Sequence, residues 1–236
     1  MSQVEGFDLS DRTELVLADK GFGPDLGSAL VEGAPDLVTL DVRGNLLGAT
    51  GATSLASLEK LETLRLGPGR IYGEGNRIGA AGARGLLAAS GSLTDVDLSK
   101  NQVDGAAFEV VKQPLVRLVV DSNPIGDEGC AAIARIETLE VLHLGWSGVG
   151  DACAEALSGH AGIRELLLSS NGVTDLGVAA LARMPKLETL YVSNNSLTQA
   201  TPLAHVDRLN VDGNALVDRE TLVAAHDGSW LSAEAP

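Results

Sequence analysis

The chain has 236 residues, of which 37 are leucine, 28 are glycine and only 7 are aromatic. Its 17 Lys and Arg residues face 32 Asp and Glu residues, which gives a formal net charge of −15. With 44% hydrophobic residues the chain can bury a core, and wholesale disorder is excluded. Because nucleic-acid backbones and anionic membrane surfaces are bound by clustered Lys and Arg, we expect neither a nucleic acid nor a membrane as partner.

The first residues, MSQVEGFDLSDRTEL, contain no basic region and no apolar stretch, so the sequence predicts no secretory signal. No apolar run approaches the ~18 residues of a membrane-spanning helix. Cys130 and Cys153 are too few for a disulfide framework and lack a CxxC spacing. We therefore expect two small core residues, rather than a redox pair or a metal site, and a cytoplasmic location.

A unit of the form LxxLxLxxNxL, with Ile or Val also allowed at its last position, recurs along most of the chain. Nine copies occupy residues 12–216, and they start at residues 12, 37, 61, 93, 115, 139, 163, 187 and 206. The LxL alternation predicts a short strand, and the apolar spacing that follows it predicts a short helix. Each copy should therefore form one strand–helix coil of a solenoid. The third copy carries an insertion within residues 67–75.

The second halves of the copies, such as NRIGAAGARGLLA at 76–88, NPIGDEGCAAIA at 123–134 and NGVTDLGVAALA at 171–182, are Gly- and Ala-rich. Together with the repeated strand motif they resemble the leucine-rich-repeat family, in its ribonuclease-inhibitor-like subclass, with the ~24-residue period of bacterial members. The resemblance implies an α/β fold: a curved, horseshoe-shaped solenoid with a parallel sheet on the concave side and short helices on the convex side. We expect a single domain, with residues 1–11 as the N-terminal cap and 217–236 as a helical C-terminal cap that uses Leu222, Val223, Trp230 and Leu231.

Two sets of polar residues have a predicted structural role. Seven copies keep Asn at the turn after the strand, where a buried amide can bond the backbone of adjacent coils. These residues, called the Asn column below, are Asn45, Asn76, Asn101, Asn123, Asn171, Asn195 and Asn214. Carboxylates also stand where helices should begin, at Asp127, Glu128, Asp151 and Asp175, and exposed helical N–H groups favour negative charge there.

Side chains that flank the strand leucines should point to solvent on the concave face. The early copies present charges there, including Asp41, Arg43, Arg65, Asp95 and Asp97, whereas copies five to eight present an apolar and aromatic patch. Exposed aromatic anchors with a polar rim are typical of interfaces. The predicted partner-binding residues are Arg117, Val119, Asp121, Val141, His143, Trp146, Glu165, Leu167 and Tyr191, with Arg70 and Tyr72 from the insertion. Strand propensity alone could also explain Val119 and Leu167, and the insertion could be without function.

No catalytic residue, cofactor or metal is expected. The chain has no GxSxG, HExxH or phosphate-loop pattern, and its four histidines lack ligand spacing. Asp95, Asp97 and Asp121 should lie close together, but an open sheet face favours solvated charges over a general acid–base pair.

The sequence predicts a non-catalytic protein–protein interaction module that binds a partner protein through its concave face. We expect a monomer, and the acidic charge favours a basic partner surface. The alternative is a regulator of a small GTPase, because the resembled subclass includes Ran GTPase-activating proteins. Homo-association through a poorly capped end, and a scaffold without a natural ligand, also remain open.

Overall fold

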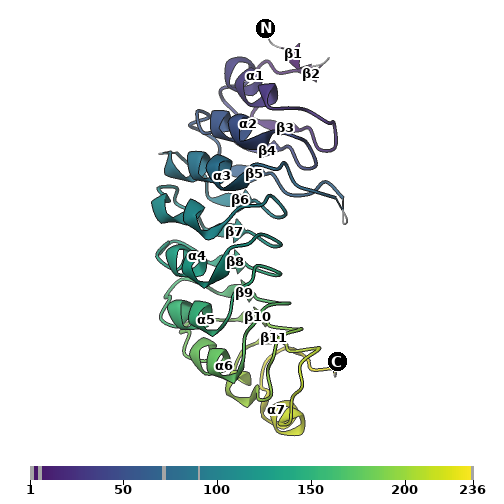
Figure 1. Ribbon diagram of the computed structural model, residues 1–236, viewed down its shortest axis with the longest axis vertical. Coiled ribbons are helices and arrows are strands. Elements are labelled where there is room, and N and C mark those ends of the chain that lie inside the picture. The colour runs from purple at the N-terminus through teal and green to yellow at the C-terminus, as the bar shows by residue number, and fades with distance from the viewer. Residues whose placement is uncertain (1–2, 5–6, 71–72, 90, 235–236) are drawn as a thin grey trace. The chain divides into compact units, whose positions relative to one another are not determined.

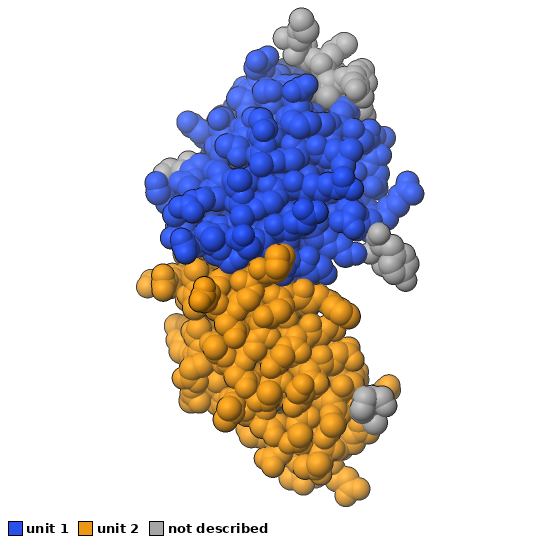
Figure 2. Space-filling view, viewed as in Figure 1, with its two compact units in different colours: residues 1–123 blue, residues 124–236 orange. Residues whose placement is uncertain are grey.

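The computed structural model describes residues 3–4, 7–70, 73–89 and 91–234. The chain divides into two compact units, Met1–Asn123 and Pro124–Pro236, which Figure 2 colours blue and orange. In each unit strands alternate with short helices, and Figure 1 shows the strands on one side of the coils and the helices on the other. The α/β solenoid class is therefore confirmed, whereas the single-domain organisation stays a prediction.

The first unit begins with a small antiparallel pair, β1 (Gln3–Val4) and β2 (Phe7–Asp8). Its parallel strands follow chain order and are β3 (Glu14–Val16), β4 (Thr39–Asp41), β5 (Thr63–Arg65), β6 (Asp95–Asp97) and β7 (Arg117–Val119). The helices between them are α1 (Asp25–Gly33), α2 (Gly48–Leu55), α3 (Gly79–Ala88) and the 3-10 helix η1 (Gly105–Val110).

The second unit repeats this plan. Its parallel strands are β8 (Val141–His143), β9 (Glu165–Leu167), β10 (Thr189–Tyr191), β11 (Arg208–Asn210) and β12 (Trp230–Ser232). Its helices are α4 (Gly126–Ile133), α5 (Asp151–Leu157), α6 (Asp175–Leu181), the 3-10 helix η2 (Thr201–Leu203) and α7 (Arg219–Ala225). Each of the nine predicted copies thus supplies one strand, and β12 adds a strand that the motif did not predict.

The core of each coil lies between its strand and its helix. The central residue of every strand from β3 to β11 is buried and stands in register with its neighbour within the same unit, as Leu40 does with Leu64 and Leu166 with Leu190. Small residues bring neighbouring helices close together. A Cβ added to Gly27 of α1 would lie 2.3 Å from the carbonyl oxygen of Gly51 in α2, so this contact requires glycine.

The Asn column is confirmed as structural. Asn101 is fully buried, and its amide nitrogen donates to the carbonyl oxygens of Leu66 in the preceding coil and Leu98 in its own coil. In the second unit Asn171 bonds in the same way to Leu144 and Leu168. Among the described residues no buried side-chain nitrogen or oxygen lacks a partner, so the column meets the hydrogen-bonding demand of the stacked turns.

The carboxylates at helix starts also link coils. Asp127 of α4 accepts hydrogen bonds from the backbone N–H groups of Gly150 and Cys153, at 2.6 and 3.2 Å. Asp151 and Asp175 bind the following turns in the same manner, through Thr174 at 2.8 Å and Thr198 at 2.8 Å. Part of the acidity of the chain is therefore structural, as predicted, although Asp127 bonds the start of the following helix and not of its own.

The predicted C-terminal cap is partly wrong. Leu222 of α7 is fully buried, but Val223 is 57% exposed and Trp230 is 41% exposed. Trp230 begins β12, which pairs with β11 as one more parallel strand. The strand forms because Trp230, Leu231 and Ser232 have the same outward, inward and outward order as Arg208, Leu209 and Asn210 of β11. Trp230 is thus placed on the strand side instead of under the last helix.

The prediction for the cysteines is right about their place in the core and wrong about their pairing. Cys130 of α4 and Cys153 of α5 form a disulfide, with Cα atoms 5.4 Å apart, and both residues are fully buried. The two positions are equivalent in consecutive coils, and stacking brings equivalent positions within bonding distance. Disulfides persist in oxidising compartments, so this bond weighs against the predicted cytoplasmic location, which stays a prediction. In the described part of the chain no helix has the length and apolarity needed to cross a bilayer.

Candidate functional site

The outward side chains that flank the buried central residue of each strand, together with the turn that follows, are called the strand face. It carries most of the predicted partner-binding residues. Because the coils stack in register, equivalent side chains on neighbouring strands of one unit stand side by side. The two units present different chemistry on this face.

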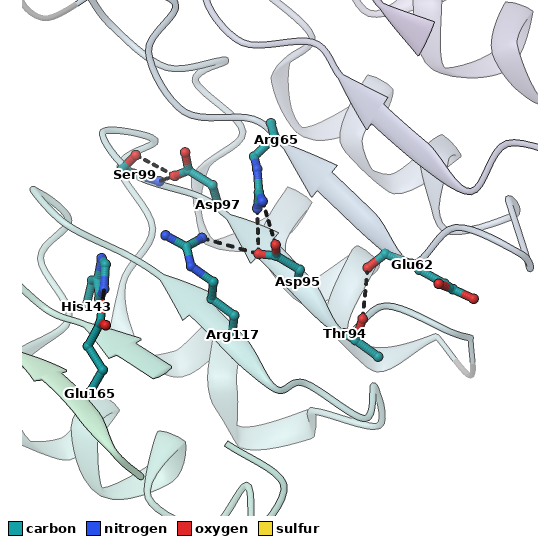
Figure 3. Close-up of polar contacts among 9 residues, drawn as sticks. All are labelled: Glu62, Arg65, Thr94, Asp95, Asp97, Ser99, Arg117, His143 and Glu165. Carbon is teal, nitrogen blue, oxygen red and sulfur yellow. Dashed lines mark hydrogen bonds and ion pairs between the residues drawn. The ribbon is translucent and has the colours of Figure 1, made fainter. Parts of the chain in front are cut away.

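The strand face of the first unit is a network of ion pairs (Figure 3). Both guanidinium Nη atoms of Arg65 on β5 meet the carboxylate of Asp95 on β6, each at 2.5 Å. Arg117 of β7 adds a longer contact to the same carboxylate at 3.2 Å. Asp41 and Arg43 pair at 2.6 Å in the adjoining coil. Asp95 is thus held between Arg65 and Arg117 of the two neighbouring strands, an ion pairing that was not predicted.

These contacts shift the acid–base properties of the carboxylates. Burial alone would raise the pKa of Asp95, but the hydrogen bonds and charges of Arg65 and Arg117 outweigh burial and hold it below its ordinary value. Burial would also raise the pKa of Asp41, but the hydrogen bonds and charge of Arg43 lower this pKa by more. Both carboxylates are therefore ionised near neutral pH, which suits an ion-pair partner and not a general acid.

The predicted binding residues of the first unit do not form an apolar surface. Val119 is only 7% exposed, so the expectation that it presents apolar surface is wrong. On this face Val119 stands in register beside Asp97 of β6. Asp121 lies in the turn after β7, where its carbonyl oxygen accepts the N–H of Lys100. Arg70 is exposed in the insertion, and Tyr72 lies outside the described residues.

The second unit brings more of the predicted residues together. His143 of β8 and Glu165 of β9 are joined by a 2.7 Å contact between Nε2 and Oε1, which Figure 3 also shows. Leu167 stands in register between His143 and Tyr191, and Val141 stands beside Glu165. All five side chains are partly exposed. The bond between His143 and Glu165 was not predicted, because they are 22 residues apart and only the stacking register joins them.

An aromatic pair extends this face. The rings of Tyr191 on β10 and Trp230 on β12 have centroids 5.7 Å apart and an interplanar angle of 40°. Trp230 was missed as a strand-face residue because its segment lacks the Asn that marks the other copies. The signal was its spacing, since Leu231 follows Leu209 by 22 residues and the two stand in register.

Trp146 has a backbone conformation that is unusual for an aromatic residue. It lies in the turn after β8, is 71% exposed, and has a left-handed φ of 55°. The equivalent turn position has a φ between 52° and 67° in seven other coils, where it is occupied by Asp19, Gly44, Lys100, Ser122, Ser170, Asn194 and Gly213. Small or polar residues suit this conformation, whereas a bulky aromatic side chain is disfavoured in it. An exposed Trp held there at a cost to stability is a candidate for function.

The polar groups of the described residues do not assemble into a metal site. Within the described ranges no three His, Cys, Asp or Glu side chains are grouped so that they could hold a metal ion. His160 is buried, and both of its ring nitrogens have hydrogen-bond partners. Its Nε2 lies 3.1 Å from the carbonyl oxygen of Ile136, and its Nδ1 accepts the N–H groups of Gly162 and Ile163. It therefore fixes a turn.

Comparison with family models now identifies the repeats. A model described as "Leucine Rich repeat" matches residues 34–56, 111–134 and 136–158, and one described as "Leucine Rich repeats (2 copies)" matches residues 162–205. The chain is a leucine-rich-repeat protein. The matches do not distinguish the ribonuclease-inhibitor-like subclass, so that finer assignment stays a prediction.

A solved structure supports the same fold for this leucine-rich-repeat protein. This chain is similar to the crystal structure of internalin C2 from Listeria monocytogenes, with a TM-score of 0.55 and 20% sequence identity. The likeness covers 96% of this chain and 82% of the internalin chain, and at this identity it shows the fold alone. The comparison with curated proteins found no match.

Proposed function

We propose that this leucine-rich-repeat protein is a non-catalytic module that binds a partner protein through the strand face of its second unit. The observation that carries the proposal is Trp146, an exposed aromatic side chain held in a left-handed turn at the end of β8. Tryptophan is among the residues that contribute most to binding at protein interfaces. A contact with a partner would explain a tryptophan at a position that disfavours it.

The neighbouring strand face supports this interpretation. Leu167 and Tyr191 supply partly exposed apolar surface beside the polar pair of His143 and Glu165. An apolar centre with a polar rim is the usual composition of an interface. The side chains stand on strands, which are rigid elements, so little conformational entropy would be lost when they are covered.

The family and the fold bear on only part of what was predicted about partners. Repeats of this family and the internalin-like fold support an interaction module in general, and they favour no particular partner. The monomeric state, a basic partner surface and the exclusion of nucleic acid and membrane stay predictions. No observation on the described residues favours regulation of a small GTPase, so that alternative stays a prediction from the resemblance alone.

Affinity capture from a lysate of the source organism tests the proposal. The bait proteins are the wild type, a Trp146→Asn/Tyr191→Ala variant, and a Leu176→Ala control. Leu176 is a suitable control because it is apolar and 76% exposed like Trp146, but lies on α6 in the same unit. We expect quantitative mass spectrometry to find a protein that the wild type and the control retain and the double variant loses. An identical set of proteins on all three baits would contradict the proposal.

A further inference from the structure

The rings of Tyr191 and Trp230 form a partly exposed aromatic pair at the end of the second unit. We infer that the partner segment on this strand face carries a Lys or Arg side chain, and that its cation binds against the rings of Tyr191 and Trp230. The inference rests on the proposed function and adds the chemical class of the bound group. Because the pair stands on β10 and β12, the segment would cross β11, which lies between them.

The geometry of the pair suits a cation. The centroids are 5.7 Å apart and the planes are tilted by 40°, so the two faces are not stacked flat against each other and ring surface stays available. Trp230 is 41% exposed, and Tyr191 is partly exposed. An ammonium or guanidinium group within ~6 Å of such a ring is attracted by the negative electrostatic potential of its face.

Two carboxylates lie in the segments that follow β11 and β12. Asp212, in the turn after β11, accepts the hydroxyl of Ser232 at 2.6 Å and the backbone N–H of Glu234 at 2.5 Å. These two bonds hold the carboxylate next to β12, and each of its oxygens keeps a further acceptor position. Glu234 is itself exposed. A Lys or Arg side chain at Trp230 could therefore pair with a carboxylate that is held against the same strand, β12, by a charge-assisted hydrogen bond.

The wider charge of the unit also favours a cationic group over an anionic one. From Pro124 to Pro236 six Lys and Arg residues face 15 Asp and Glu residues, a net charge of −9. Arg208 is the cation nearest in register, because it stands opposite Trp230. Hydrogen bonds from Ser229 lower the pKa of the Asp207 carboxyl, and the charge of Arg208 lowers it further. An acidic surface attracts basic segments and repels acidic ones during association.

Peptide binding tests the inference without knowledge of the natural partner. The probe is a fluorescein-labelled peptide of alternating Gly and Arg, and its control replaces Arg by citrulline, which has nearly the same shape and no charge. Fluorescence anisotropy gives the affinity of each peptide for the wild type and for Tyr191→Leu, Tyr191→Phe and Trp230→Leu. We expect the wild type to prefer the arginine peptide. Each Leu variant should weaken its binding by about two- to fivefold, while Tyr191→Phe, which keeps the aromatic face, should not.

Two results would overturn the inference. One is equal affinity of the wild type for the arginine and citrulline peptides. The other is a preference for arginine that both Leu variants keep, which would show general attraction to an acidic chain. If Trp230→Leu disturbs folding, as judged by circular dichroism, Tyr191→Leu and Tyr191→Phe still show whether binding needs an aromatic face or only a large apolar side chain. Failure here leaves the proposed function standing if the capture experiment succeeds, and a failed capture refutes that function whatever the peptides do.

Discussion

Breaking the disulfide between α4 and α5 should destabilise the protein by an amount that follows from its position in the chain. Cys130 and Cys153 are 23 residues apart, and a cross-link that closes a loop of this length reduces the entropy of the unfolded chain by the equivalent of about 3 kcal/mol. We expect the Cys130→Ala/Cys153→Ala variant to lose that much free energy of unfolding. Because both side chains are fully buried, the removed sulfur atoms also leave some packing unfilled.

Urea unfolding followed by far-UV circular dichroism measures this loss. Wild-type protein treated with a reductant before unfolding should lose the cross-link alone, so any further loss of stability in the variant measures the packing that the Ala substitutions remove. Alkylation in urea without reductant, followed by mass spectrometry, should leave both cysteines of the wild type unlabelled. The reasoning is refuted if both thiols are labelled under those conditions, or if the variant unfolds within about 0.5 kcal/mol of the wild type.

Three further substitutions test other parts of the structure. Asn101→Ala should cost about 2 to 3 kcal/mol in urea unfolding, because it removes a buried amide that donates to the carbonyls of Leu66 and Leu98 and accepts the N–H of Ile78. Trp146→Asn, which installs the residue type of an equivalent turn, should unfold at the same or a higher urea concentration than the wild type; a clear loss would contradict the assigned backbone cost. The stability that Asp95 supplies is present above its unfolded-state pKa of ~3.9 and is lost as the pH falls through its lower folded-state pKa. Asp95→Asn should therefore flatten the decline in unfolding midpoint below about pH 4, and an unchanged decline would refute the ion-pair role.

The fold was largely predictable because a repeat multiplies a weak local signal. One LxL alternation in isolation would fit many folds, but nine in register predict strands such as Glu14–Val16 and Arg208–Asn210, and the structure has each of them. The Asn column was predictable for the same reason, since a buried amide recurring at one turn has few other roles.

The errors occurred where contacts between coils decide the outcome. The disulfide depends on the distance between equivalent positions of α4 and α5, and the burial of Val119 depends on the side chains around it. The ion pairs of Asp95 and the contact of His143 with Glu165 likewise join residues more than 20 positions apart. Composition and periodicity within one copy carry no information on such contacts.

The strand-face site was predicted in part. Trp146 and Tyr191 stood out because aromatic residues are rare in this chain, and both are on the strand side or its turn in the structure. Trp230 was assigned to the cap because its copy lacks the turn Asn, and only the pairing of β12 with β11 corrected this. Aromatic scarcity was therefore a useful guide, while the limits of the motif hid the last strand.

The most direct test of a binding role for the strand face is the affinity of the purified captured partner for Trp146→Asn, measured by isothermal titration calorimetry beside the wild type and Leu176→Ala. An exposed aromatic anchor at an interface should cost at least about tenfold in Kd when it is removed. We predict that loss for Trp146→Asn, with the Leu176→Ala control unchanged. Equal affinity of all three proteins for the partner would contradict a binding role for Trp146.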